Sequence, residues 1–153
     1  MRPELRLPAQ AQAGERVRPV VLDTNIVLDL FLFADLAVAP LRSLLQVRRL
    51  RWLATQSMRG ELERVLQYTH LQPRMQYYRV TDADVLDAFD ADANLVEAPA
   101  RAPYACKDTD DQKFIDLAAA QGAILISKDK AVLCMRKRLL TLDVQVTTAI
   151  VFE

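Results

Sequence analysis

Short apolar runs alternate along the chain with longer stretches whose apolar residues recur at helical spacing. Runs such as PVVLD and AILIS are rich in aliphatic and β-branched residues, which is typical of strands buried on both faces. Strands are predicted over residues 19–23, 51–55, 95–98, 123–127 and 144–148. Helices are predicted over residues 33–49, 58–68, 81–94, 110–121 and 130–140. Most of the chain therefore alternates between strand and helix.

Residues that cap helices mark several of the predicted helix ends. Ser57 and Thr81 each precede a helical stretch, and a hydroxyl there can accept a hydrogen bond from an unpaired amide of the first turn. Gly122 follows the alanine-rich helix, where a C-terminal cap is expected. Two prolines indicate that APARAPYACKDT, residues 98–109, is a loop.

This alternation predicts an α/β fold. We expect a three-layer α/β/α sandwich around a mostly parallel sheet of about five strands. In such sheets, ligands bind beyond the carboxyl ends of the strands, where the strand order reverses. Residues 1–18 contain charges and prolines and are expected to form a mobile N-terminal tail, and residues 19–153 are expected to form one domain.

The composition excludes several function classes. Apolar residues make up 52% of the chain, and 20 basic side chains balance 20 acidic ones, which disfavours a protein that coats nucleic acid. The single histidine, His70, disfavours two-histidine nucleases and histidine-rich zinc sites. The two cysteines show no disulfide framework, and no apolar run approaches the roughly 20 residues that span a bilayer, so we expect a cytoplasmic protein with no membrane partner. Any chemistry must depend mostly on carboxylates.

Acidic residues recur where the predicted strands end. Asp23 ends the first strand, and Asp129 follows the fourth in ILISKD. Glu61 lies beside the apolar stripe of the second helix. Three more acids lie at the start of a helix, in CKDTDDQKF: Asp108, Asp110 and Asp111. Each acid alone has a structural alternative, as a helix cap or a solvated helix residue, but capping does not predict an acid at every such crossover.

A cluster of carboxylates indicates a metal site. Carboxylates held together repel one another, and some take up protons unless a cation neutralises them. With oxygen ligands alone, Mg²⁺ or Mn²⁺ is favoured. A water on such an ion can be deprotonated and directed at phosphorus, so hydrolysis of a phosphodiester is the expected reaction.

Three segments, VVLDTN, SMRGELERVL and DDQKFIDLAAAQGAILISKD, resemble in order and spacing the PIN domain family of metal-dependent ribonucleases. The resemblance covers about residues 19–153. It is closest to a branch described as toxin components of toxin–antitoxin pairs, whose members carry a segment similar to CKDTDDQKF. It implies a PIN-like fold, an Mg²⁺ or Mn²⁺ site, cleavage of RNA, an antitoxin partner and a homodimer.

Carried over by position, the resemblance implies metal-binding and catalytic roles for four acids: Asp23, Glu61, Asp111 and Asp129. Asp108 and Asp110 leave the third acid ambiguous, and Asp111 fits best because Phe114 and Ala118 then fall on that helix's apolar positions. The resemblance also implies that three polar residues orient the ligands: Thr24, Asn25 and Ser127. Asp116 and Lys128 depart from residues common at those positions in relatives, but no ligand is missing.

Contacts to phosphate must come from local basic residues, because the chain has no net charge. The candidates lie near the predicted acids, although each can instead be a solvated surface residue: Arg59, Lys128, Lys107 and Lys113. Trp52 is expected in the core or a dimer surface, and the apolar Leu30–Phe33 segment in a subunit contact. Cys106 and Cys134 are expected to be buried thiols.

Two other function classes share part of this pattern. A phospho-receiver switch also has a parallel sheet and an acidic Mg²⁺ pocket, but it needs an acidic pair after the first strand, where VVLDTN has one acid. A PIN-like module without catalysis could bind RNA or protein instead. Such a module does not need intact acids, so the intact acids of this chain argue against it. We therefore expect a metal-dependent endoribonuclease that hydrolyses RNA phosphodiester bonds.

Overall fold

A computed structural model describes residues 2–153 and contains a five-stranded sheet whose strands all run parallel. The strand order is β4-β3-β2-β5-β6. The strands are β2 (Arg18–Leu22), β3 (Leu50–Ala54), β4 (Asn94–Leu95), β5 (Ile124–Ile126) and β6 (Gln145–Thr147). Strands β3 and β4 lie on one side of β2, and the later strands β5 and β6 lie on its other side. The strand order therefore reverses between β2 and β5.

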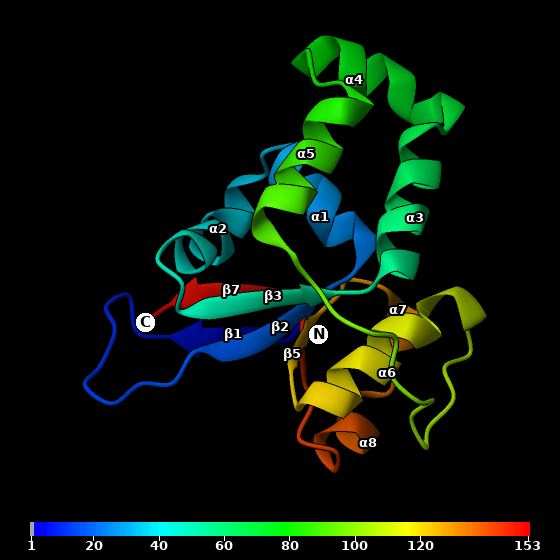
Figure 1. Cartoon of the computed structure of the whole chain (residues 1–153). Helices are drawn as coiled ribbons and strands as arrows, with labels where there is room; N and C mark the ends of the chain where they lie inside the picture. The colour runs from blue at the N-terminus through cyan, green and yellow to red at the C-terminus, as the bar shows by residue number, and fades with distance from the viewer. Residues whose placement is uncertain (1) are drawn as a thin grey trace.

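Eight α-helices in residues 2–153 cover both faces of this sheet (Figure 1). One layer contains α1 (Thr24–Phe31), α2 (Ala39–Gln46), α3 (Gln56–Leu66), α4 (Gln72–Tyr78) and α5 (Asp82–Asp92). The opposite layer contains α6 (Gln112–Gln121), α7 (Lys130–Leu133) and α8 (Arg136–Leu140). Single 3-10 turns precede α2, α4 and α6, at Leu36–Val38, Thr69–Leu71 and Thr109–Asp111. The predicted three-layer α/β/α sandwich is confirmed.

The core forms where aliphatic strands meet the apolar faces of the helices. Every residue of β5 is buried, as are Val20 to Leu22 of β2, which explains their uninterrupted apolar runs. Trp52 of β3 lies between two rings, with its centroid 6.0 Å from Phe31 and 5.0 Å from Phe89. Trp52 is therefore a core residue.

Helix caps agree with the sequence at two of the three predicted positions. Thr81 forms a capping box with Asp84 at the start of α5, and Gly122 ends α6 in the left-handed conformation. The third prediction is wrong, because Thr55 rather than Ser57 caps α3 by accepting a hydrogen bond from the Met58 amide. Thr55 directly follows β3, so the chain turns into the helix two residues earlier than expected.

Several local boundaries also differ from those predicted. The stretch 33–49 is helical only from residue 36, as a 3-10 turn followed by α2. The helix predicted over 130–140 is interrupted at Cys134 and Met135. Strand β4 has two residues instead of the predicted four. Helices α1 and α4 were not predicted, because each is short and has few sequence signals of its own.

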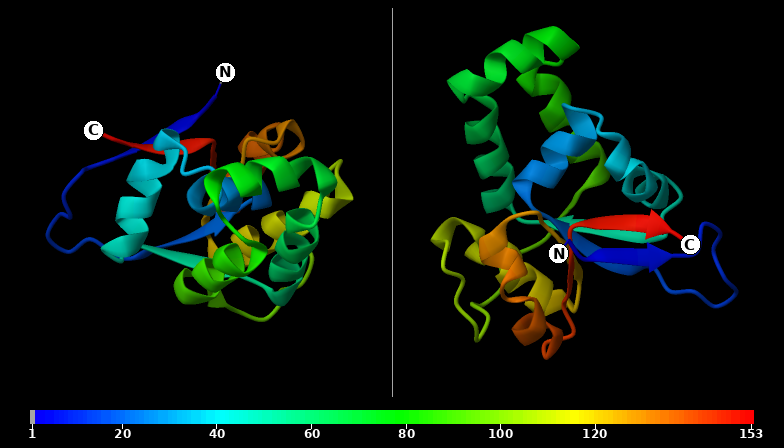
Figure 2. Two further views of the ribbon diagram at one scale, coloured as in Figure 1. Left: turned by 90° about the horizontal axis from the view of Figure 1, so that it is seen from above. Right: turned by 180° about the vertical axis from the view of Figure 1, so that it is seen from behind.

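Part of the segment expected to be a tail forms a strand. Strand β1 (Glu4–Leu7) pairs in parallel with β7 (Ala149–Phe152), next to α2 (Figure 2). The hydroxyls of Thr147 and Thr148 both donate to the Pro3 carbonyl and fix the start of this pair. No local pattern predicts this strand, because β1 is short, half-exposed and paired with residues more than a hundred positions away.

No single helix in residues 2–153 has the length and apolar composition needed to cross a membrane. The pair Thr24–Phe31 and Leu36–Gln46 passes a composition test only together, with a bend of 104° between its parts. The buried side chains of both helices belong to the core.

Substitution of Gly122 and Gly60 tests the backbone conformations at these two positions. Gly122 has φ +58°, so Gly122→Ala should lower the free energy of unfolding by about 1 kcal/mol. Gly60 lies inside α3, where alanine is the better helix former, so Gly60→Ala should raise it by roughly 0.5–1 kcal/mol. Urea unfolding of both variants checks the opposite signs, and equal effects would contradict the assigned conformations.

Candidate metal centre

Asp23 lies at the carboxyl end of β2, where the strand order reverses. Its side chain is buried, and its Oδ2 accepts a hydrogen bond of 2.6 Å from the Ser127 hydroxyl. Asp23 occupies the N-cap position of α1 but makes no side-chain capping bond, so capping does not account for this acid. Burial raises the pKa of Asp23, and the negative charges of Asp129 and Glu61 add to the effect.

Asp129 follows the adjacent strand, β5, and serves two purposes. Its Oδ1 accepts a hydrogen bond of 2.9 Å from the Ala131 amide and caps α7. Its own amide donates to the Ser127 hydroxyl at 3.1 Å. Ser127 thus links the backbone amide of Asp129 to the Asp23 carboxylate through one hydroxyl group. Asp129 caps α7, and its carboxylate also lies beside those of Asp23 and Asp111.

Asp111 approaches the same place from the start of α6. It is buried, and its Oδ2 is the one buried side-chain N or O atom in the described residues without a hydrogen-bond partner. Burial, the adjacent Asp129 carboxyl and the charge of Asp23 raise the pKa of Asp111 to about 8. An unsatisfied buried carboxylate oxygen is costly, so this atom requires either a proton or a cation.

The three carboxylates converge. Asp23, Asp111 and Asp129 each offer an oxygen atom, and these atoms all lie within 4.8 Å of one another. Asp108 and Asp110 are exposed, and Asp108 instead caps the 3-10 turn by accepting from the Asp110 amide at 3.0 Å. The geometry therefore favours Asp111 among the three acids of this segment.

Glu61 lies at the edge of the cluster and is already engaged. One of its oxygens accepts a hydrogen bond from the Thr24 hydroxyl, and the other lies 2.8 Å from the Lys113 ammonium. Thr24 is buried and thus orients Glu61, while Asn25 is exposed. Glu61 is near enough to influence the charge of Asp23 but lies outside the group of three converging acids.

The four basic candidates have different surroundings. Lys113 contacts Glu61 and the Asp110 carbonyl, directly beside the acids. Lys128 forms an ion pair of 2.6 Å with Asp29 of α1. Arg59 donates two hydrogen bonds of 2.7 and 2.8 Å to Asp90 and also pairs with Glu63, so its guanidinium is already engaged by two acids outside the cluster. Lys107 is exposed on the loop before Asp108.

Sequence reasoning missed two acids that support the site. Asp29 is buried and pairs with Lys128, but its helix was not predicted. Asp116 accepts hydrogen bonds of 2.8 Å from the Ala102 amide and the Gln112 side chain, and so holds the loop that leads to Asp111. The expectation of two buried thiols is wrong for Cys134, which is exposed at the end of α7, whereas Cys106 is buried.

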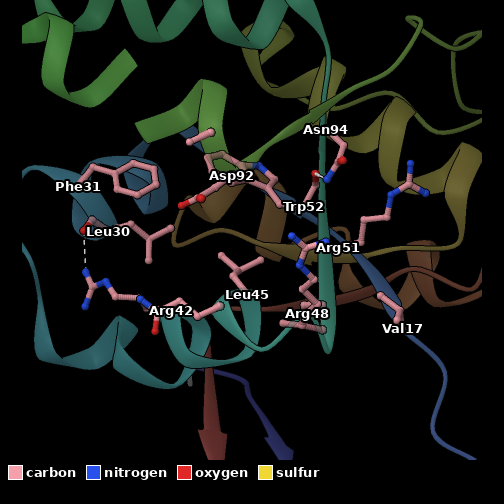
Figure 3. A pocket seen from close by; sticks show the side chains of 13 residues that line it. Val17, Leu30, Phe31, Arg42, Leu45, Arg48, Arg51, Trp52, Asp92 and Asn94 are labelled. Carbon is pink, nitrogen blue, oxygen red and sulfur yellow. Dashed lines mark hydrogen bonds between the residues drawn. The ribbon is translucent and has the colours of Figure 1, made fainter. Parts of the chain in front are cut away.

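A cavity of about 740 Å³ lies elsewhere, between α2, β3 and the end of α5 (Figure 3). Leu30, Phe31 and Trp52 line it, and Arg42 at its margin donates a hydrogen bond of 2.6 Å to the Leu30 carbonyl. It contains none of the acids of the metal centre. Leu30 and Leu32 are buried in the core, so the Leu30–Phe33 segment is not the continuous surface patch that the sequence suggested.

The three converging carboxylates fit a hard cation. They supply oxygen ligands only, and no ion pair within residues 2–153 involves any of them. A divalent ion bound here would satisfy the orphaned Asp111 oxygen and remove the repulsion that raises the pKa values of Asp23 and Asp111.

Comparisons with known proteins agree with this fold. Residues 19–131 match the family described as PIN domain. The structure is also similar to a chain in the crystal structure of VapBC2 from Rickettsia felis bound to a DNA fragment from their promoter, with a TM-score of 0.56. The two chains are 14% identical, and the alignment covers 84% of this chain and 98% of that chain. At this identity the likeness supports a common fold alone.

A search of curated proteins gives no match. The family match nevertheless extends over most of the chain and includes Asp23, Asp111 and Asp129. PIN domains are generally nucleases. The sequence match and the parallel-sheet fold together show that the chain belongs to the PIN domain family.

Proposed function

We propose that this protein is a metal-dependent endoribonuclease that hydrolyses RNA phosphodiester bonds. The observation that carries the proposal is the Asp111 oxygen that is buried without a partner among three converging carboxylates. A stable fold keeps such an arrangement at a cost, because burial and the neighbouring carboxylates raise the pKa of Asp23 and of Asp111. Perturbed carboxylates at the reversal of strand order are typical of functional sites in parallel sheets.

In this proposal Asp23, Asp111 and Asp129 hold Mg²⁺ or Mn²⁺, and Glu61 joins them from α3. A bound ion would neutralise phosphate charge and supply a water acidic enough to attack phosphorus at neutral pH. Ser127 fixes Asp23 and Asp129 relative to each other, and Thr24 fixes Glu61. We assign no direct role to Asn25 beyond its place beside Thr24.

Lys113 and Lys128 are the basic side chains best placed to contact the RNA phosphates. Lys113 borders the acids through Glu61, and Lys128 stands between Ser127 and Asp129 in the chain. Lys107 can add a more distant contact from its exposed loop. Arg59 is the weakest candidate, because Asp90 and Glu63 occupy its donors.

We further propose an antitoxin partner, a homodimer and a cytoplasmic location. The motifs that resemble toxin components and the likeness in fold to a chain of VapBC2 support the partner. An antitoxin that silences the enzyme would cover the acids. Co-purification with a neighbour-encoded protein, and light scattering of the purified chain, check the partner and the dimer.

The first prediction concerns activity. Asp111→Asn should lower Mn²⁺-dependent cleavage of labelled RNA by roughly 100-fold or more, since it removes a ligand and a negative charge. Asp110→Asn is the matched control, because Asp110 is the adjacent, exposed acid, and it should retain activity. EDTA should abolish cleavage by the parent. Cleavage that survives EDTA, or that depends on Asp110 and not Asp111, contradicts the assignment.

The second prediction concerns stability in EDTA. The pKa of Asp111 is about 8 in the folded protein and about 3.9 in an unfolded chain. Between these two pH values, the Asp111 carboxyl is protonated in the folded state and ionised in the unfolded state. The free energy of unfolding should therefore fall as the pH rises from about 4 to about 8. Asp111→Asn should flatten this decline and be more stable than the parent at pH 8.

Urea unfolding at pH 5, 6.5 and 8 measures this dependence, with Asp110→Asn as the control that keeps the decline. Saturating Mn²⁺ should stabilise the parent more at pH 8 than at pH 5, because protons compete with the ion for the carboxylates. A parent protein whose stability in EDTA rises steadily over this range would show that the acids are not clustered.

A further inference from the structure

Exposed aromatic side chains gather on α4, opposite the end of α1. Tyr77 is 81% exposed and Tyr78 46% exposed, and Phe33 and Arg74 lie beside them. These four residues, here called the aromatic platform, line an open cavity of about 680 Å³ together with Asp29, Asp35 and Pro73. Large aromatic side chains exposed together are uncommon on a protein surface unless they bind a partner.

The rings of the platform support one another. The Tyr77 and Tyr78 rings lie 5.1 Å apart at 87°, and Tyr78 meets Phe33 edge-on at 6.3 Å. The Arg74 guanidinium lies over the Phe33 ring, 5.3 Å from its centroid. The Tyr77 ring therefore packs against Tyr78 and remains exposed to solvent. A base can stack on such a ring whatever its identity.

One ion pair links the lining of this cavity to the segment that carries Asp129. Asp29 lines the cavity and lies six residues after Asp23 on α1, a rise of about 9 Å. The Asp29 carboxylate binds Lys128, which directly precedes Asp129 in the chain. A single strand of a few nucleotides is long enough to span a separation of this order.

The charges around the platform are compatible with a nucleic acid. Lys128 neutralises Asp29, and Asp35 is engaged in capping the 3-10 turn, where it accepts from the Ala37 amide at 3.0 Å. Arg74 remains as a cation beside the rings, stacked on Phe33 rather than held by a carboxylate in an ion pair within residues 2–153. An arginine next to aromatic rings is a common arrangement in sites for single strands.

We propose that the aromatic platform binds the unpaired bases of a single-stranded RNA whose phosphate backbone passes the metal centre. The proposal rests on the proposed nuclease function and adds to it a base-binding surface on α4. Bases in a duplex are stacked on one another and cannot reach Tyr77, so the platform selects single-stranded segments. Its energetic contribution is to binding, and the hydrolytic residues act independently of it.

The test is the affinity of the full chain for a fluorescent 12-nucleotide single-stranded RNA, measured by anisotropy. EDTA prevents cleavage in one series, and Asp129→Asn in Mn²⁺ serves in a second. Tyr77→Ala should weaken binding about tenfold, and Tyr77→Phe should restore it because the ring is kept. Tyr68→Ala is the matched control, since Tyr68 is an exposed tyrosine outside the cavity that packs on His70.

Two further ligands make the result specific to bases. An abasic strand with the same phosphates should bind equally to the parent and to Tyr77→Ala, and a duplex of the same sequence should bind without dependence on Tyr77. If the parent binds no single strand in either series, or if Tyr77→Ala binds as the parent does, the proposal is wrong and the surface serves a protein instead. Tyr77-dependent binding without Mn²⁺-dependent cleavage would refute the nuclease function but would still support the proposal that the platform binds bases.

Discussion

The proposed metal site depends on three carboxylates that the fold holds together against their mutual repulsion. Asp23, Asp111 and Asp129 come from three separate segments, and their oxygen atoms lie within 4.8 Å of one another. Two of the three acids are buried, where solvent screens their charges poorly. The parallel sheet creates this proximity, because the ends of β2 and β5 meet where the strand order reverses. Hydrophobic burial of those strands and of α6 balances the cost of holding the acids in place.

The surrounding charges are arranged differently from those of the cluster. Lys128 pairs with Asp29 and Lys113 with Glu61, so the acids that flank the cluster on α1 and α3 each have a basic partner. Asp23 accepts a hydrogen bond from the Ser127 hydroxyl and Asp129 accepts one from the Ala131 amide, but none of the three converging acids forms an ion pair in residues 2–153. A negative charge left without a partner in one place, within a chain of balanced charge, is the electrostatic signature of a cation site.

The sequence reveals the centre of the site better than its periphery. Asp23 and Asp129 can be found because each follows a buried aliphatic strand, and Asp111 can be separated from Asp110 by the apolar phase of the helix that contains Phe114. The partner of Arg59 cannot be found in this way, because Asp90 lies on another helix, 31 positions away. The β1–β7 pair joins the two ends of the chain and carries no local pattern, and the short α1 that supplies Asp29 was missed for the same reason.

A crystal structure of the protein soaked with Mn²⁺, with the ion located by its anomalous scattering, tests the central claim most directly. The account predicts a peak between β2 and β5, within coordination distance of Asp23, Asp111 and Asp129, and with the Asp111 oxygen among its ligands. A crystal saturated with Mn²⁺ that shows these three carboxylates without an ion, or an ion held by other residues, would contradict it.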